Sequence, residues 1–569
     1  MPTKRPPARK PERPAPVAEP KRFSLHMFLE RGAAWIALAL VLLASIRIAA
    51  TYTVFNHTSD EPNHIACGME WWQRGTYTFE TQHPPLARIA AALGPYWIGA
   101  RIHGEVPHDS LIVPQEGTRI LYRDHRYDLT LALARLGILP FFWIACAVVY
   151  LWGRRYFSPE VALLATFLFT MIPPVLAHAG LATTDMPLTA FVGAAFLSAL
   201  IWVETPTPRT ALIFGACCGL AVISKFSSLP FIPACLGCAL ILYFAFERPP
   251  LPSLLAAIRP RLPSLGLAIL AAVVVIWAGF RFSFGRVTPG GIPIPAPELV
   301  TGFQAALAHN RFGHHTYLLG KYSMKGFWYY YPVVLAFKTP LALLILFLAG
   351  LFLVPAHKLP KPVWQPLALI AGILAVGLQS HINIGVRHIL PIYMGIALLA
   401  ALAVHRLPSL LGGRLWTHAA VAALLVWIAA SSLLAHPDYI PYFNELAGSR
   451  PENIMVDSDL DWGQDLKRLS RRLQEVGADH VTFFTTLIAS LEKEHGFPPV
   501  YRPDPFKPSP GWNAVSMTSW KLTRMGLMLV ATDGKLYNSY PDRTLWPDAV
   551  PRGELVGKTI LLWNVVPTQ

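Results

Sequence analysis

Long apolar stretches alternate with short polar connections over the first three quarters of the chain. About eleven of these stretches have roughly 15 to 23 residues, which is near the length that a helix needs to cross a bilayer. They cover residues 33–52, 129–152, 159–177, 186–203, 211–224, 229–246, 262–280, 332–354, 365–379, 389–404 and 419–435. The pattern predicts a polytopic α-helical membrane protein.

The last part of the chain, residues 436–569, has ordinary polarity and follows a different pattern. The segment NIMVDSDLDWGQDLKRLSRRLQEVGADHVTFFTT predicts a strand, an acidic turn, an amphipathic helix that starts near Gly463 and ends at Gly477, and a second strand. WNAVSMTSW, RMGLMLVAT and KTILLWNVV predict further strands or strand–helix pieces. We therefore expect a small α/β domain at the C-terminus.

Composition and charge agree with a membrane protein. A chain of 569 residues with 53% hydrophobic and 14% charged residues is too apolar for a soluble protein of this size. The net charge of +15 is typical of nucleic-acid-binding proteins, but the basic residues gather in the N-terminal tail and in every second connection. This asymmetry predicts that those segments are cytoplasmic, and no nucleic-acid partner is expected.

The same asymmetry gives a domain organisation. Residues 1–31 are rich in Pro and charge, which predicts a disordered cytoplasmic tail, and the first apolar stretch is long enough to be an anchor and not a cleaved signal peptide. Residues 32–435 form the predicted transmembrane domain, with outer loops at 53–128 and 281–331, and 436–569 form the extracytoplasmic domain. Because the cytoplasmic connections are short, function is expected on the outer face.

Three acids lie at the predicted outer boundary. Asp60 and Glu61 follow the first span, and Asp185 opens the fourth. Asp185 also fits a helix N-cap before Pro187, and Asp60 also fits a turn residue before Pro62. The functional interpretation of Asp60 is a base or a substrate ligand, since a nearby carboxylate takes the proton of an attacking hydroxyl.

Basic side chains occur on the same predicted face. Lys338 falls inside a span, where an unpaired charge is costly, so it is expected to face a cavity or an anion. Lys225 also fits a residue that extends to the membrane surface. Four cations together favour an anionic headgroup such as a phosphate: they are Arg88, Lys225, Lys338 and Arg387.

Other patterns carry less weight. Cys235 and Cys238 form a CxxC in an apolar helix, which indicates packing of small residues more than a redox site. DSDLDWGQD does not fit a calcium loop, because Gly463 comes one residue late and Arg468 stands at the twelfth position. Its acids are expected to cap a helix, and the His spacings leave open whether a divalent metal ion takes part.

Several motifs resemble one known superfamily. SDEPNH and HPPLAR resemble the first outer loop of the protein O-mannosyltransferase and aminoarabinose-transferase superfamily, and TTDMP and GLAVISKFS resemble its later motifs. FKTPL, NIGVRHILPIY and YFNELAGSRPENIMVDSDLDWGQDLKRL resemble a bacterial, family-39-like branch. The resemblance implies a GT-C glycosyltransferase fold in the bacterial cytoplasmic membrane. It also implies three kinds of partner: a polyprenyl-phosphate-linked sugar donor, a protein, lipid or glycan acceptor, and the surrounding membrane lipids.

The resemblance also implies roles for residues. Asp60 is expected to be the catalytic base of an inverting transfer, and a Lys338→Ala substitution is expected to weaken donor binding. The implied substrate-binding residues are Glu61, His64, His83 and Asp185, and the implied lipid-phosphate-binding residues are Arg88, Lys225, Lys338, Arg387 and His388. A transporter or flippase of a lipid-linked or anionic solute is the alternative, which long outer loops and the absence of a discernible inverted repeat disfavour.

Overall fold

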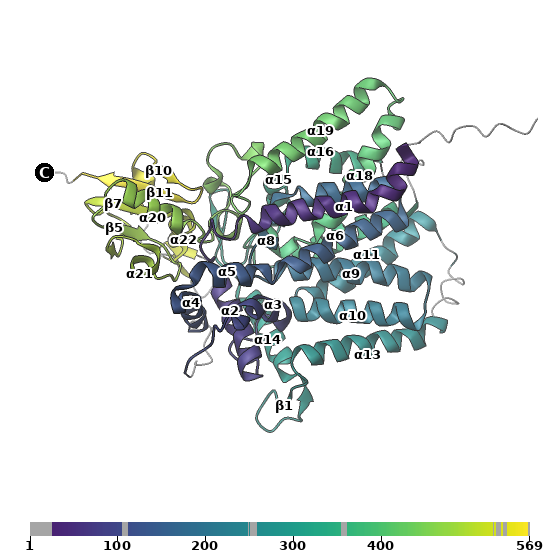
Figure 1. The fold of residues 1–569 in the computed structure, drawn as a ribbon, viewed down its shortest axis with the longest axis horizontal. Helices are drawn as coiled ribbons and strands as arrows, with labels where there is room; N and C mark the ends of the chain where they lie inside the picture. The colour runs from purple at the N-terminus through teal and green to yellow at the C-terminus, as the bar shows by residue number, and fades with distance from the viewer. Residues whose placement is uncertain are drawn as a thin grey trace, which may run out of the picture.

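Helices fill one end of the molecule and a small mixed sheet fills the other (Figure 1). The computed structural model describes residues 25–104, 112–248, 250, 259–353, 361–526, 528–530, 536–538 and 543–566. The predicted disordered tail lies mostly outside these residues. Its last part differs from the prediction, since α1 (Leu25–Ala49) already begins at Leu25.

Seven helices or joined helices are long and apolar enough to cross a membrane in the described part of the chain. They are α1, α5–α6 (Tyr127–Leu136 and Leu139–Tyr156), α9 (Asp185–Glu204), α11 (Ser228–Glu247), η2–α13 (Arg259–Arg261 and Leu262–Gly279), α18 (Ile392–Leu410) and α19 (Leu415–Leu434). Two bent pairs and two shorter apolar helices join them: α7–α8 (Pro159–Thr170 and Pro173–Ala179), α15–α16 (Tyr330–Lys338 and Leu341–Leu353), α10 (Pro208–Ser224) and α17 (Trp364–Gly377). All the predicted apolar stretches are therefore helical, while the number that cross the bilayer stays a prediction.

The two bent pairs differ from the continuous spans that the sequence predicted. The axes of α7 and α8 meet at 69°, and those of α15 and α16 at 119°. Proline disfavours the helical conformation of the residue before it. Ile172 before Pro173 and Thr339 before Pro340 are accordingly extended, with ψ of 111° and 135°. Proline therefore breaks both apolar stretches, and the second break lies at the end of the bundle that contacts the C-terminal unit.

Burial separates inner from outer helices of the bundle. Most of α9 and α18 is buried, whereas α11, α13 and α19 expose most of their apolar residues. An apolar helix that is exposed in the isolated chain is expected to face lipid. The chain is thus an integral membrane protein with α9 and α18 at its centre.

Three further helices lie between α1 and α5, in the segment that the sequence predicted as the first outer loop. They are α2 (Glu61–Arg74), α3 (Pro85–Trp97) and α4 (Val113–Tyr122), and η1 (Arg123–His125) leads into α5. Glycines let them pack closely, because a Cβ at Gly68 of α2 would lie 1.9 Å from the carbonyl oxygen of Arg88, and one at Gly117 of α4 would lie 1.8 Å from that of Pro62. This contact fixes the start of α2, where Asp60 lies.

The second outer loop holds α14 and two short hairpins. Their bounds are α14 (Pro297–Phe312), β1 (Phe284–Gly285) with β2 (Ile294–Pro295), and β3 (Thr316–Leu318) with β4 (Lys321–Ser323). Single-turn 3-10 helices follow later in the chain: η3 (Lys361–Val363), η4 (Val386–Ile389), η5 (Glu445–Ala447), η6 (Pro451–Asn453) and η7 (Asp457–Asp459). Among these, η4 and η7 carry residues of the site described below.

The C-terminal unit is a five-stranded mixed sheet in the order β10-β11-β7-β5-β6. β5 is parallel to both β6 and β7, and the other two pairs are antiparallel. The strands are β5 (Val481–Phe484), β6 (Val500–Tyr501), β7 (Gly511–Ser516), β10 (Glu554–Val556) and β11 (Ile560–Val565), with a separate pair of β8 (Met528–Val530) and β9 (Leu536–Asn538). The helices are α20 (Leu466–Glu475), α21 (Leu491–His495), α22 (Met517–Gly526) and α23 (Trp546–Ala549).

Both faces of the sheet are covered. Alternate residues of one strand enter different cores, as Phe483 packs with Leu469 of α20 while Phe484 packs with Trp520 of α22. The strand predicted before the acidic turn does not form, because the backbone there bonds to the second outer loop, with the N–H of Leu319 donating to the carbonyl of Ile454 at 2.8 Å. The predicted α/β architecture is otherwise present.

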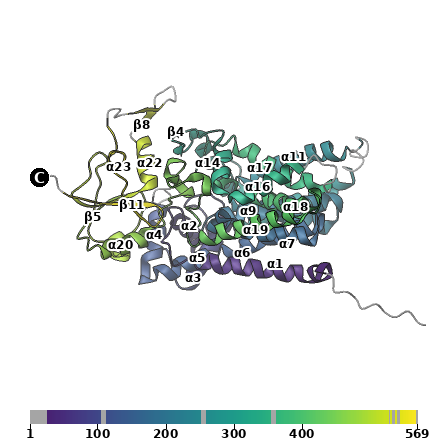
Figure 2. The same ribbon diagram turned by 90° about the horizontal axis from the view of Figure 1, so that it is seen from above.

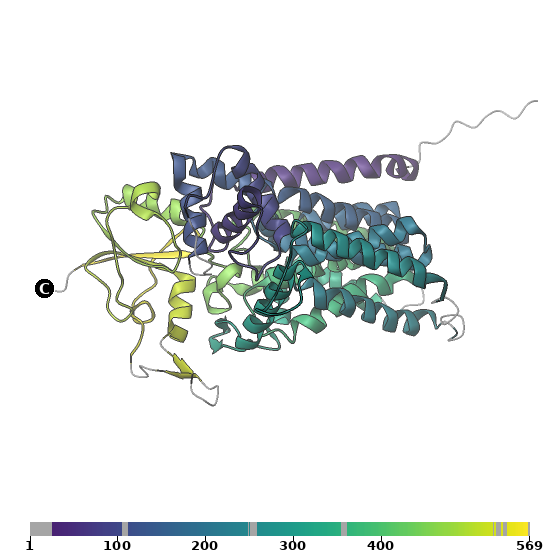
Figure 3. The ribbon, with the colours of Figure 1, turned by 90° about the horizontal axis from the view of Figure 1, so that it is seen from below.

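The two parts of the molecule meet at one end of the bundle. In Figure 2, α1 runs along the edge of the bundle, and its first residues lie at the end away from the sheet. Figure 3 shows the same arrangement from the opposite side, with the outer helices between bundle and sheet. The predicted outer loops and the C-terminal unit therefore share one end.

Candidate active site

A chain of alternating charges connects four separate segments at the junction of bundle and sheet. Arg387 of η4 donates from Nη1 to Oδ2 of Asp60 at 2.8 Å, and the same Nη1 lies 4.0 Å from Oδ2 of Asp185. Nζ of Lys225 donates to Oδ1 of Asp185 at 2.6 Å. Two predicted acids and two predicted cations are thus brought together from three helical segments and η4.

Burial differs strongly within this cluster. The side chain of Asp185 is fully buried at the start of α9, while that of Asp60 is 36% exposed before α2. Among the described residues, the ammonium of Lys225 donates one hydrogen bond, to Asp185. Two of its three protons therefore stay available. The cluster therefore has an enclosed end at Lys225 and an open end at Asp60.

The guanidinium of Arg387 packs against an aromatic ring. Its guanidinium carbon lies 4.0 Å from the ring centroid of Trp462, which is a cation–π contact. Its Nε is buried and has no hydrogen-bond partner in the described part of the chain. The guanidinium is thus fixed in place while its buried Nε–H stays unused by the described residues.

The electrostatics keep Asp60 ionised. Burial acts to raise the pKa of Asp60, but the positive charge of Arg387 and the neighbouring histidines outweigh it, and the pKa lies below its ordinary value. His388, beside Arg387 in sequence, has a pKa well below its ordinary range because it is buried near the Lys225 and Arg387 charges. A carboxylate and a neutral imidazole are therefore present at neutral pH.

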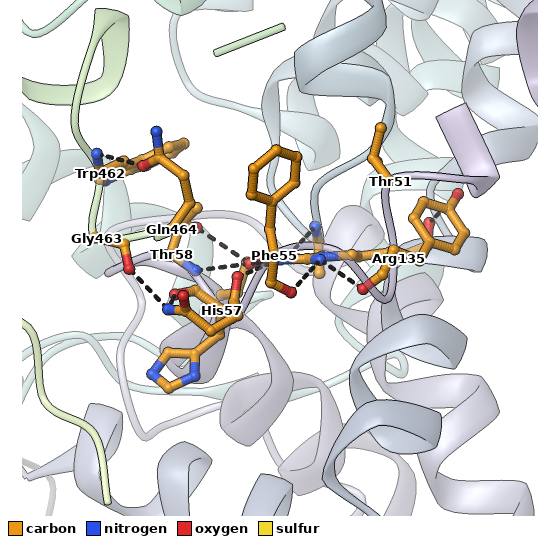
Figure 4. Close-up of polar contacts among 12 residues, drawn as sticks. Thr51, Phe55, His57, Thr58, Arg135, Trp462, Gly463 and Gln464 are labelled. Atoms are coloured by element: carbon orange, nitrogen blue, oxygen red, sulfur yellow. Dashed lines mark hydrogen bonds and ion pairs between the residues drawn. The ribbon is translucent and has the colours of Figure 1, made fainter. Parts of the chain in front are cut away.

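Glu61, one residue after Asp60, points away from this cluster. Its buried carboxylate accepts two bonds of 2.8 Å from Nε and Nη2 of Arg135, and further bonds from the N–H of Thr58 and of Ala182. Arg135 also donates to the carbonyls of residues 52, 55 and 56 (Figure 4). Glu61 thus stabilises the loop that carries Asp60. Arg135 was missed in the sequence, although its position inside an apolar stretch was a signal.

His64, His83 and Arg88 form a second network beside the first. Arg88 is fully buried, ion-pairs with Glu80, and donates to Nδ1 of His64 at 3.0 Å and to the hydroxyl of Tyr77 at 2.8 Å. The rings of His64 and His83 lie edge to face, 5.3 Å apart. The donors of Arg88 are thus committed to protein groups. The structure gives Arg88 the geometry of a structural residue.

Lys338 is also separate from the cluster. Its ammonium donates to three carbonyls, those of Ile440 at 2.8 Å, Tyr442 at 2.5 Å and Asp459 at 2.6 Å. A Lys ammonium has three protons, so none is left for a phosphate. The buried position that the sequence indicated is present, and its partners among the described residues are three carbonyl groups.

The acidic segment of the C-terminal unit closes over the loop that carries Asp60. Nδ2 of Asn56 donates to the carbonyl of Gly463 at 2.7 Å, and its Oδ1 accepts from the N–H of Leu466 at 2.7 Å. The N–H of Ser59 donates to the carbonyl of Trp462 at 3.2 Å. Figure 4 shows this turn against the loop. The helix begins at Leu466 and not near Gly463 as expected; Asp461 accepts from the N–H of Gly463 at 3.0 Å in the turn before it, and the residue at the N-cap, Asp465, makes no side-chain cap bond.

Metal ligation has little support in these residues. The described residues contain no group of three or more His, Cys, Asp or Glu side chains arranged to hold a metal ion. The cysteines of the CxxC are free thiols. The chemistry that the geometry carries is that of carboxylates, cations and a neutral imidazole.

Comparisons with known proteins agree with this architecture. Residues 134–277 match the family model for dolichyl-phosphate-mannose-protein mannosyltransferase. The crystal structure of ArnT from Cupriavidus metallidurans bound to undecaprenyl phosphate is 14% identical, with a TM-score of 0.51 over 94% of this chain and 99% of that one. No curated protein sequence matches the chain significantly.

Two further solved structures resemble the chain less closely. ArnT in the apo state is 13% identical with a TM-score of 0.48, over 95% of this chain and 100% of that one. The Archaeoglobus fulgidus oligosaccharyltransferase tethered with an acceptor peptide is 13% identical with a TM-score of 0.43, over 92% of this chain and 75% of that one. The family match over residues 134–277 and the fold shared with undecaprenyl-phosphate-bound ArnT confirm the resemblance found in the sequence: the chain is similar to protein mannosyltransferases and has the GT-C fold of ArnT.

Proposed function

We propose that the chain transfers a sugar from a polyprenyl-phosphate donor to a hydroxyl of a protein, lipid or glycan acceptor, at the outer face of the bacterial cytoplasmic membrane. The observation that carries this proposal is Arg387 between Asp60 and Asp185, with Lys225 at the enclosed end. ArnT, which shares the fold, binds undecaprenyl phosphate. In this assignment the N-terminus is cytoplasmic and the C-terminal unit is extracytoplasmic.

The cations of the cluster are assigned to the donor phosphate. Lys225 has protons to spare, Arg387 has an unused Nε, and the neutral imidazole of His388 lies in the field of both charges. Negative charge grows on the leaving phosphate as the glycosidic bond breaks, and fixed cations stabilise that charge. Arg88 and Lys338 have no place in this assignment, because their donors are committed to protein groups.

Asp60 is assigned as the base. It is ionised, partly exposed and next to Arg387, so it can accept the proton of the acceptor hydroxyl while that oxygen forms a bond to the anomeric carbon. The carbon–oxygen bond to phosphate breaks in the same step, which inverts the anomeric centre. Asp185 holds Lys225 and Arg387 in position, Glu61 holds the loop, and His64 and His83 line the neighbouring network.

The proposal is tested in cells that lack the chain and are complemented with variants. Asp60→Asn is expected to lower transfer on the order of a hundredfold to ten-thousandfold. Mass spectrometry of lipid extracts and surface glycans then shows a polyprenyl-phosphate sugar that accumulates and a glycan that disappears. Asp479→Asn is the matched control, because the side chain of Asp479 is 84% exposed on the C-terminal unit.

Each outcome has a distinct meaning. Accumulation in both the deletion and the Asp60→Asn strain, with normal profiles in Asp479→Asn, supports catalysis and names both substrates. An Asp60→Asn protein that reaches the membrane and transfers the sugar at the normal rate contradicts the assignment of Asp60 as the base. A deletion phenotype that Asp60→Asn fully rescues favours transport of the lipid-linked sugar.

A further inference from the structure

One aspartate of the acidic segment 457–465 differs from the other three. Asp461 accepts from the hydroxyl of Ser516 at 2.5 Å, and Asp465 accepts from the hydroxyl of Thr559 at 2.9 Å, so both attach the segment to the sheet. Asp459 accepts from the N–H of Val386 at 3.0 Å. For Asp457, the described residues offer one bond to the carboxylate, from the N–H of the next residue at 2.6 Å.

The backbone holds Asp457 in a specific position. Its φ of +62° lies in the left-handed region, which is unfavourable for most residues and is tolerated best by Gly, Asn and Asp. The N–H of Asp457 donates to the hydroxyl of Thr518 at 2.8 Å, and the hydroxyl of Ser458 donates to the carbonyl of Ile384. A conformation of this kind persists because contacts on both sides fix it. These contacts attach the segment to α22 on one side and to the residues before Arg387 on the other.

The charged groups around Asp457 are those of the active site. Burial raises the pKa of Asp457 to about 6; the positive charge of Arg387 acts in the opposite direction, and the negative charges of Asp60 and Asp461 add to the effect of burial. Asp459 of the same segment and Tyr330 of α15 also lie within its field. The geometry agrees, because Asp457 is two residues from Asp459, whose carboxylate accepts from the N–H of Val386 beside Arg387.

Two buried atoms at this place lack partners. Nε of Arg387 and Oδ2 of Asp459 form no hydrogen bond with the described residues, although Arg387 is 6% and Asp459 is 1% exposed. Buried polar atoms are nearly always satisfied, so unpaired ones point to a bound polar molecule. Asp459 bonds to the N–H of Val386, the residue before Arg387, so the unused acceptor and the unused donor belong to one region of the site. Such a pair fits a hydroxyl-bearing ligand, because a hydroxyl both donates and accepts.

We propose that Asp457 is a substrate-binding carboxylate of this active site, which accepts a hydrogen bond from a hydroxyl of the acceptor. The inference rests on the proposed transferase function. It makes the C-terminal unit a wall of the active site that contributes to acceptor selection.

The position of the segment favours the acceptor over the donor. Lys225 and Asp185, at the enclosed end of the cluster, belong to the helices of the bundle, where a lipid phosphate arrives from the membrane. Asp457 belongs to the segment that bonds to Thr518 of α22 in the C-terminal unit and to the N–H of Val386 beside Arg387, so it lies between that unit and Arg387. An acceptor that enters between the sheet and the bundle reaches Asp457 and Asp60 together.

The test uses purified full-length protein. The glycolipid that accumulates in the deletion strain is the donor probe, and membranes of that strain supply unmodified acceptor. Asp457→Asn keeps a residue that tolerates a positive φ, so the backbone is retained. The variant is expected to raise the half-saturating amount of acceptor membranes on the order of tenfold to a hundredfold, with the half-saturating donor concentration unchanged. Asp479→Asn is the control.

The pH profile gives an independent readout. Transfer by the unchanged protein is expected to fall as the pH drops through about 6, because the Asp457 carboxylate becomes protonated there. Asp60 does not titrate in this range, because its pKa is lowered. The pKa of Asp465 is also raised to about 6, so the loss of this acid limb in Asp457→Asn is needed to assign it.

The outcomes separate the two proposals. Absence of any transfer by the unchanged protein overturns the proposed function itself. Normal transfer that Asp60→Asn abolishes, together with an Asp457→Asn protein whose acceptor dependence and pH profile are unchanged, overturns the role of Asp457 alone. An unchanged protein without an acid limb between pH 5 and 7 also overturns it, whether or not the variant folds.

Discussion

Asp60 and Glu61 are neighbours in sequence with opposite environments. Asp60 is partly exposed and faces Arg387, while Glu61 is fully buried and paired in two-bond geometry with Arg135. Because Glu61 also accepts backbone N–H groups, no part of its carboxylate is left for a substrate. Asp60 is therefore placed for the reaction, while Glu61 stabilises the loop that carries it.

This division predicts a stability difference. Glu61→Ala leaves the buried guanidinium of Arg135 without its counter-charge, which is expected to destabilise the protein by about 3–5 kcal/mol. Thermal unfolding of the purified protein in detergent measures the effect. Glu475→Ala is the control, because the side chain of Glu475 is 54% exposed and its ion pair contributes little. A Glu61→Ala protein that melts together with the control contradicts the supporting role.

The sequence reveals which charged residues are buried, but it does not reveal their partners. A charge inside an apolar stretch must be paired, and Lys338 and Arg135 are both buried and paired. The rule does not name the partner, which for Lys338 is a set of carbonyls from a segment about a hundred residues later in the chain. Asp185 and Lys225 were placed on the same face from topology alone, and the structure joins them directly.

At the scale of elements, α15 connects the bundle to the chain that leads into the C-terminal unit. Lys338 ends α15, directly before the break at Pro340, and its three bonds go to the segment from Ile440 to Asp459. Asp459 in turn accepts from the N–H of Val386, beside Arg387. The ammonium thus ties the end of a broken span to the segment that positions the site.

A substitution at Lys338 should therefore loosen this segment. Lys338→Met is expected to increase hydrogen exchange in residues 440–460, because three buried carbonyls lose their donor, while binding of undecaprenyl phosphate stays nearly unchanged. Hydrogen exchange followed by mass spectrometry measures the first effect and equilibrium binding the second. Lys325→Met, at an exposed bond of the second outer loop, is the control. If hydrogen exchange in residues 440–460 is unaltered and binding of undecaprenyl phosphate is lost, Lys338 is a phosphate-binding residue after all.

The helices were predictable from the sequence because apolar runs reveal them directly. The bends at Pro173 and Pro340 could also have been predicted, since proline disfavours the helical conformation of the residue before it. The strand expected at residues 454–456 was wrong, because an apolar run of this length does not reveal whether its backbone pairs within a sheet or bonds to a distant loop.

At the scale of the whole molecule, the site depends on contacts between distant parts of the chain. Asn56 bonds to Gly463 and Leu466, and Arg387 bonds to Asp60. A single sequence contains no signal for pairs this far apart. The sequence could therefore supply the candidate residues of the site, but not the turn that closes over them or the place of Asp457 beside them.

The arrangement of charges along the molecule predicts its orientation in the membrane. α9 begins at the site with Asp185 and has 20 residues, so its other end lies about 30 Å away. The next helix, α10, begins there with Arg209 in its first turn, in one of the basic regions expected in the cytoplasm. The C-terminal unit lies at the opposite end of the bundle (Figure 1). These two regions should therefore be on opposite sides of the membrane.

Labelling of introduced cysteines measures this orientation. In spheroplasts, Asp479→Cys is expected to react with a membrane-impermeant maleimide, while Arg209→Cys reacts only after the membrane is permeabilised, because both positions are exposed but on different sides. The unchanged protein gives the background, since its cysteines are buried or half-buried thiols. Labelling of Arg209→Cys in intact spheroplasts, with Asp479→Cys protected, would reverse the orientation and place the site on the cytoplasmic face.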